Sequence, residues 1–113
     1  MSKSLSDICK IQREFDQKHS VSGKSFYVDI NESNLHELEH LVVCLMGELG
    51  EFSNILKKVV RGDNSLSEAK ISLNEELVDT FIYLIKISNQ FNVDLEKEFL
   101  KKVDKNKRRF GEN

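Results

Sequence analysis

Residues 41–60, LVVCLMGELGEFSNILKKVV, place acidic side chains where a helix is expected to bury itself. At about 100° per residue, the large apolar side chains fall on one arc of the helix: Leu41, Leu45, Leu49, Phe52, Leu56 and Val59. Glu48 projects inside the same arc, and Glu51 lies three residues later at its edge. Because a carboxylate in an apolar stripe is costly unless a positive charge meets it, Glu48 requires a cationic partner.

Residues 73–90, LNEELVDTFIYLIKISNQ, repeat this arrangement. Glu76 projects at the flank of an apolar arc, and Asp79 follows three residues later on the same side. If the two helices pack together, four carboxylates converge and repel one another. A hard divalent cation, which prefers carboxylate oxygens as ligands, is the simplest solution. The sequence therefore predicts a divalent metal site between two helices.

The overall composition excludes several classes of protein. The chain has 113 residues, enough for a single domain, and its 32% charged and 39% hydrophobic residues are typical of a folded protein. A net charge of −2 gives no basic surface for a nucleic-acid polymer. No apolar run approaches the roughly 20 residues of a membrane span, and the first residues lack the apolar core of a signal peptide. With Cys9 and Cys44 interpreted as buried free thiols, we expect a cytoplasmic protein without a membrane partner.

Periodicity and capping residues predict an all-α fold of four helices joined by short loops. The first helix should cover 5–18, and the second should begin at Asn34, in a capping box with Glu37, and end before Gly62. The third should begin at Ser65 or Ser72 and end near residue 89. The fourth should begin at Asn92 or Asp94, continue through Val103 and fade over 105–110. Residues 19–33 are predicted as a loop with aromatic contacts that could form one wall of a ligand pocket.

Three segments, GELGEF, EELVDTFIYLI and VDLEKEFLKKVDKNKRRF, together resemble the MazG-type nucleoside triphosphate pyrophosphohydrolases. The resemblance covers residues 34–110 and is closest to the small single-domain dCTP pyrophosphatase branch. It implies that residues 1–113 form one MazG-like domain with a four-helix, bundle-like fold. Because four helices of this size rarely enclose much core alone, we expect oligomerisation as a homodimer or homotetramer to complete the fold. The resemblance also implies the hydrolysis of a nucleoside triphosphate, with a dCTP-like substrate, to the monophosphate and diphosphate, in nucleotide-pool house-cleaning.

The same resemblance assigns roles to individual residues. The Mg²⁺ ligands, for which Mn²⁺ is the expected substitute, match Glu48, Glu51, Glu76 and Asp79. Tyr83 and Asn106 match positions that face the nucleotide, and Lys102 is expected to reach the phosphates. The chain departs from the general family pattern at Gly47, where other branches have an acid, and it has no tryptophan to contact the base. The number of metal ions and the preferred base therefore stay open.

The residue types suit this chemistry. Cleavage between the α and β phosphorus atoms requires neutralised phosphate oxygens and an activated water, both of which a carboxylate-bound Mg²⁺ provides. Glu48 or Glu51 is the candidate general base. Lys102, Asn106 and Arg109 share one face of the last predicted helix, where they could meet phosphates.

Two other interpretations compete with this one. His36, Glu37 and His40 satisfy the HExxH pattern of zinc proteases, but no third ligand stands out downstream. A non-catalytic helical interaction module would instead pair Glu48 and Glu76 with cations at Lys58, Lys86 or Arg61.

Overall fold

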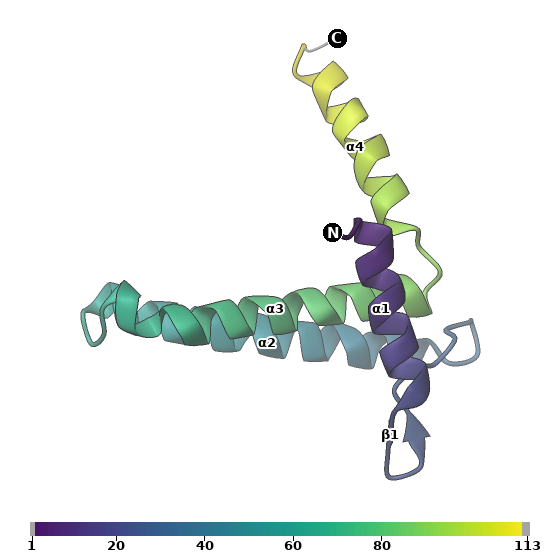
Figure 1. Cartoon of the computed structure of the whole chain (residues 1–113), viewed down its shortest axis with the longest axis horizontal. Helices are drawn as coiled ribbons and strands as arrows, with labels where there is room; N and C mark the ends of the chain where they lie inside the picture. The colour runs from purple at the N-terminus through teal and green to yellow at the C-terminus, as the bar shows by residue number, and fades with distance from the viewer. Residues whose placement is uncertain (1, 112–113) are drawn as a thin grey trace.

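The computed structural model describes residues 2–111 and confirms the all-α prediction. Its four helices are α1 (Leu5–Lys18), α2 (Leu35–Arg61), α3 (Leu66–Gln90) and α4 (Leu95–Arg109). Two short strands, β1 (Ser20–Val21) and β2 (Lys24–Ser25), lie between α1 and α2. Figure 1 shows α2 and α3 side by side as a long hairpin, with α1 crossing one end and α4 projecting away from it.

The turn between α2 and α3 is encoded locally. Gly62 ends α2 in the left-handed conformation at φ 92°, and its N–H donates to the carbonyl groups of Lys58 and Val59. Ser65 begins α3 in a capping box with Glu68, which selects Ser65 over Ser72 as the start signal. The two long helices are therefore antiparallel neighbours, and their acidic residues can face each other.

Buried polar side chains at the end of α3 hold the other segments in place. The Asn89 amide nitrogen donates to the Cys9 carbonyl oxygen of α1 at 2.9 Å. Gln90, which is 2% exposed, accepts from the Val28 N–H at 3.1 Å and donates to the Phe26 carbonyl oxygen at 3.1 Å. These bonds fix α1 and the segment at Phe26–Val28 against the same end of the hairpin.

Two local predictions were wrong. Residues 19–33 were expected to contain no strand, yet Ser20 and Ser25 pair in a small antiparallel hairpin whose turn, Ser22-Gly23, has positive φ at both positions.

The expected capping box of α2 is also absent. Asn34 precedes α2, but its side chain accepts from the Asn31 N–H and donates to the Asp29 carbonyl oxygen. Glu37 instead pairs with Lys24 at 2.8 Å, because the β2 strand brings that cation over the first turn of α2.

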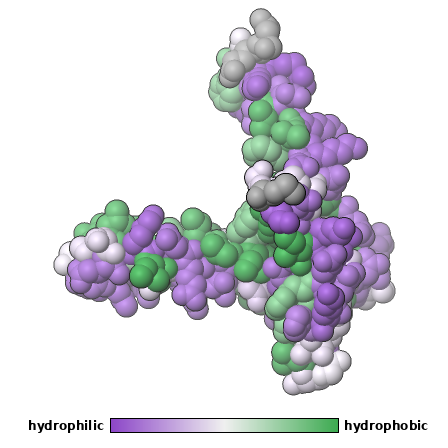
Figure 2. Space-filling model, in the orientation of Figure 1, coloured by the Kyte–Doolittle hydropathy of each residue, from purple (hydrophilic) through white to green (hydrophobic). Residues whose placement is uncertain are grey.

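The apolar core is small for a chain of this length. Within residues 2–111, five apolar residues are buried: Ile30, Leu41, Ala69, Leu73 and Ile85. Leu49 and Leu56, which the periodicity placed on the buried arc, are 42% and 39% exposed, and α4 has no buried residue. Figure 2 shows apolar patches along the hairpin and on α4.

The two cysteines are unpaired, as predicted, but half-buried rather than buried. In the part of the chain that the structure describes, no helix is long and apolar enough to cross a membrane.

Candidate functional site

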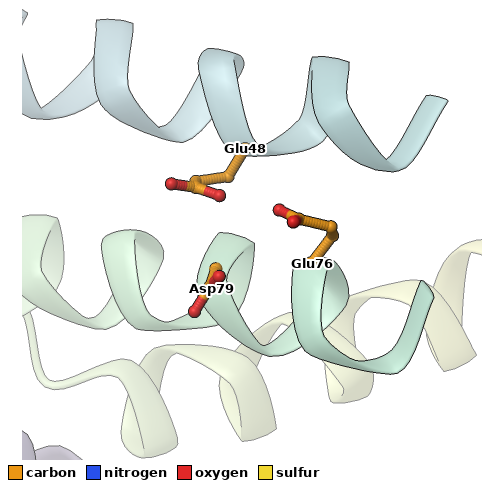
Figure 3. Close-up of side chains that lie close together, drawn as sticks. All are labelled: Glu48, Glu76 and Asp79. Atoms are coloured by element: carbon orange, nitrogen blue, oxygen red, sulfur yellow. The ribbon is translucent and has the colours of Figure 1, made fainter. Parts of the chain in front are cut away.

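Acidic side chains from α2 and α3 meet in the middle of the helical hairpin. Glu48 comes from α2, and Glu76 and Asp79 come from adjacent turns of α3. One carboxylate oxygen of each lies within 4.8 Å of the others, and all three side chains are half-buried. Figure 3 shows Glu48 and Glu76 pointing toward each other between the two helices, with Asp79 beside them. Within residues 2–111, this is the only such group of three or more potential metal ligands.

Glu76 lies at the electrostatic centre of this group. The neighbouring Glu51 carboxyl group, partial burial and Glu48 together raise the pKa of Glu76 to about 7, with Glu51 the largest cause. Glu51 therefore belongs to the cluster through Glu76, although it lies outside the tight group of three. One oxygen of Glu76, Oε2, is shielded from solvent and has no hydrogen-bond partner among the described residues.

No protein cation neutralises these acids in the described part of the chain. Lys86 pairs with Asp16 at 2.9 Å, and Arg61 pairs with Asp63. No lysine or arginine forms an ion pair with Glu48 or Glu76 within residues 2–111, contrary to what a purely structural role requires. The unpartnered Glu76 oxygen and the all-oxygen donor set fit a hard divalent cation such as Mg²⁺ or Mn²⁺.

An aromatic cleft adjoins the acids. A hollow of about 470 Å³ runs from Glu48 and Asp79 to the rings of Phe15, Phe26 and Tyr83. Its lining is completed by Gln12, Ile82 and Lys86. Aromatic faces beside a carboxylate cluster suit a ligand that has a planar group at one end and a charged group at the other. The planar group can stack on the rings while the charged group lies at the acids.

A second hollow of about 370 Å³ adjoins the aromatic cleft. It shares Phe26, Tyr83 and Lys86 with the first, and the small β-hairpin and the start of α2 form its rim. The predicted pocket wall in residues 19–33 therefore contributes Phe26 to both hollows and Val21, Lys24, Ser25 and Val28 to the second.

Of the two predicted nucleotide-facing residues, Tyr83 and Asn106, Tyr83 lies in the aromatic cleft. Burial, followed by the neighbouring Cys44, raises the pKa of the Tyr83 phenol above its usual value. Tyr83 therefore keeps its proton at neutral pH and can donate a hydrogen bond toward either hollow.

The predicted residues of α4 are not brought to the acids of the same chain. Lys102, Asn106 and Arg109 lie on α4, which contacts α1 and projects away from the hairpin (Figure 1). Lys102 lines a small hollow on α4 itself, together with Glu98, Lys101, Lys105 and Arg108.

The HExxH pattern does not form a zinc site. His36 is 73% exposed on its side chain and lies 3.4 Å from Glu37, whereas His40 contacts the Cys44 sulfur at 3.6 Å. No cluster of three metal ligands in residues 2–111 includes either histidine.

The cleft also contains residues that the sequence interpretation did not assign to a site. Phe15 lies on α1 and Lys86 on α3, so no local motif unites them. A signal was nevertheless present, because Lys86 interrupts the apolar run IYLIKIS and Asp16 follows the apolar face of α1.

The chain is similar in sequence to curated dCTP pyrophosphatases. It is 29% identical to dCTP pyrophosphatase 1 of Homo sapiens over 75% of this chain and 52% of that protein. It is 30% identical to dCTP pyrophosphatase 1 of Bos taurus over 75% of this chain and 53% of that protein. The chain thus spans about half the length of the curated relatives that it matches.

This similarity supports a relationship to nucleotide pyrophosphatases. No family model matches the chain. No solved structure matches it either.

Proposed function

We propose that this protein is a Mg²⁺-dependent nucleoside triphosphate pyrophosphohydrolase, which converts a (d)NTP and water into the (d)NMP and diphosphate. The carboxylate cluster between α2 and α3, which no cation of the described residues neutralises, is the observation that carries the proposal. The similarity to dCTP pyrophosphatases supports a dCTP-like substrate and a role in nucleotide-pool house-cleaning.

In this proposal Glu48, Glu76 and Asp79 form the tight ligand set, and Glu51 completes it beside Glu76. A bound divalent cation supplies charge neutralisation at the phosphate oxygens and lowers the pKa of water. Glu76 would hold the cation in its deprotonated form, because a nearby positive charge favours the carboxylate over the protonated acid.

Glu51 is the better placed general base of the two candidates, Glu48 and Glu51. Glu48 belongs to the tight group of three, whereas Glu51 is exposed and adjoins only its edge. In the proposed step, Glu51 accepts a proton from the attacking water while the new oxygen–phosphorus bond forms. The bond that links the α and β phosphoryl groups breaks, and the diphosphate leaves with the electron pair of that bond.

The nucleoside would extend from the acids along α3 into the aromatic cleft. Asp79 and Tyr83 are four residues apart and both line the 470 Å³ hollow, so phosphates at the acids place the sugar and base near Tyr83. The Tyr83 phenol then donates to the nucleoside, and the aromatic rings stack against its base.

The phosphate contacts proposed for α4 require a second copy of the chain. Because α4 projects away from the hairpin of its own chain, Lys102, Asn106 and Arg109 would reach the triphosphate of a partner subunit in a homodimer or homotetramer. Exposed apolar side chains on the hairpin and on α4 provide the surfaces for such an assembly.

A panel of nucleoside triphosphates with Mg²⁺, scored separately for diphosphate and orthophosphate, tests the proposal. We expect diphosphate as the product, and its release should stop when Mg²⁺ is chelated. Glu76→Ala should abolish turnover, whereas the adjacent exposed Glu75→Ala should not. Orthophosphate as the product, an inert wild-type protein, or full activity in Glu76→Ala would each contradict the proposal.

A further inference from the structure

A buried ion pair stands at the far end of the proposed nucleoside cleft. Asp16 of α1 has 0% exposure, and its Oδ1 atom lies 2.9 Å from the Lys86 ammonium group of α3. The Lys86 side chain is 13% exposed. Its ammonium group lies 5.2 Å from the ring centroid of Phe26 and 5.7 Å from that of Tyr83. The cation is thus held between two aromatic rings that also line the cleft.

Lys86 has unused hydrogen-bonding capacity. An ammonium group carries three N–H donors, and within residues 2–111 its only hydrogen-bond acceptor is Asp16. Gln12 is fixed beside it, because its amide nitrogen donates to the same Asp16 oxygen at 3.0 Å. The Gln12 carbonyl oxygen is therefore left as an acceptor in the hollow that Gln12 and Lys86 both line.

Stability alone does not account for this pair. Removing two charges from water costs several kcal/mol, and apolar residues of similar volume usually stabilise a core as well or better. The second oxygen of Asp16 is buried without a partner, which adds to the cost. A cation kept in a cleft at such a cost is best explained by a ligand that it contacts.

The spacing along α3 identifies which part of a nucleotide ligand Lys86 would contact. Asp79 and Lys86 are separated by two helical turns, about 10 Å at 1.5 Å per residue. Both line the same hollow, with Tyr83 between them. If phosphates lie at the carboxylates, a nucleoside extends over Tyr83 and brings the edge of its base to Lys86.

We propose that Lys86, held by Asp16 between the rings of Phe26 and Tyr83, reads the nucleobase and selects bases that carry a carbonyl oxygen over adenine. The inference rests on the proposed nucleotide hydrolysis. Among the neutral acceptors of a base, a carbonyl oxygen is the one that a cationic donor binds best. Cytosine, uracil, thymine and guanine present such an oxygen, and adenine lacks it. The Gln12 oxygen accepts from an N–H group on the same base edge.

Steady-state kinetics of Lys86→Met with dCTP, dTTP, dGTP and dATP test the inference. The variant keeps the length of the side chain and removes its charge. We expect kcat/KM to fall roughly 10- to 100-fold for the nucleotides that wild type prefers, and little for dATP. The loss should appear in KM with kcat nearly unchanged, because a base contact is made equally in the ground and transition states. Lys70→Met, at an exposed lysine of α3, should leave all four values unchanged.

The double variant Asp16→Leu, Lys86→Met separates recognition from folding. It replaces the buried pair by apolar side chains, so its melting temperature should equal or exceed that of wild type. Its base preference should be lost all the same. If wild type hydrolyses nucleotides but prefers dATP, or if either Lys86 variant keeps the wild-type base ratios, the inference is wrong while the proposed function stands. An inert wild-type protein would overturn both.

Discussion

Glu76 is the residue at which protons and metal ions compete. Its pKa, raised to about 7 mainly by Glu51, means that the metal-free folded protein holds a proton that the unfolded chain releases near pH 4.5. The stabilising effect of this proton is complete below about pH 4.5 and is lost as pH rises through about 7. The acid cluster therefore opposes folding most strongly at alkaline pH.

We expect the melting temperature of the metal-free protein to fall between pH 5 and pH 8. Glu76→Gln should remove most of this fall, because the variant carries no titrating group at that position. Adding Mg²⁺ at pH 8 should raise the melting temperature of wild type more than that of Glu76→Gln. Thermal unfolding in chelator and in Mg²⁺ measures both effects. A wild-type profile that runs parallel to that of Glu76→Gln at every pH contradicts the assignment.

Glu51 and Asp79 should respond differently to loss of charge. Glu51→Gln removes the proposed base and should lower kcat by roughly 10²- to 10⁴-fold, while Mn²⁺ affinity changes less. Asp79→Asn removes a carboxylate of the tight group and should weaken Mn²⁺ binding itself. Calorimetric titration with Mn²⁺, alongside kinetics, distinguishes the two roles. Equal loss of Mn²⁺ binding in both variants would show that Glu51 serves chiefly as a metal ligand and would contradict its role as the base.

At the residue level, the sequence predicted the acids and only part of their surroundings. Glu48 and Glu76 were recognisable because helical periodicity places them within or beside apolar arcs. Phe15 and Lys86 were not, because their proximity depends on how α1 docks on α3. Such docking depends on long-range hydrogen bonds, such as that from Asn89 to Cys9, which have no local pattern.

Among the elements, the segment at Phe26–Val28 is the one whose position determines the shape of the cleft. Its backbone is held by the Gln90 side chain, which both accepts from Val28 and donates to Phe26. The Ile30 N–H adds a bond to the Gln90 carbonyl oxygen at 2.9 Å. Phe26 reaches both hollows from this anchored position.

Gln90→Leu should loosen this wall. The variant keeps the volume but leaves the Val28 N–H and the Phe26 carbonyl group without partners, at a cost of about 2 to 4 kcal/mol in the free energy of unfolding. We also expect a higher KM for nucleotide and faster amide hydrogen exchange at Val28, because Phe26 is no longer held. Urea unfolding and hydrogen exchange measure these effects, and the exposed Gln17→Leu is the matched control. Unchanged exchange at Val28 would contradict the anchoring role of Gln90.

The helices themselves were largely predictable, because their ends are encoded by neighbouring residues. Ser4, Ser65 and Asp94 cap helices through side-chain oxygens within a few residues, and Gly62 ends α2 by its left-handed conformation. The β-hairpin was missed because each strand has only two residues, too few for an alternating pattern. The direction of α4 was also unpredictable, since periodicity specifies a face and not an orientation.

The whole molecule is more extended than a chain of 113 residues should be. Its radius of gyration is 17.2 Å. A compact domain of this size is expected near 13 Å. Exposed apolar residues of α2 also form a stripe at helical spacing that is interrupted at Ser53: Val42, Met46, Leu49, Leu56 and Val60. Leu77, Phe81 and Leu84 form a second stripe on α3. Two hairpins that bury these stripes against each other would complete a four-helix bundle.

We therefore expect a homodimer or larger assembly in solution, and a charge in the stripe should dissociate it. Leu56→Glu places a carboxylate among apolar side chains of the partner, so light scattering after gel filtration should show a shift to monomer. Asn54→Glu adds the same charge outside the stripe and should leave the assembly intact. Because the α4 cations are proposed to act on the partner's triphosphate, the Leu56→Glu monomer should also lose turnover while Mn²⁺ still binds between its own α2 and α3. A monomeric wild-type protein with full activity would show that each chain builds its site alone.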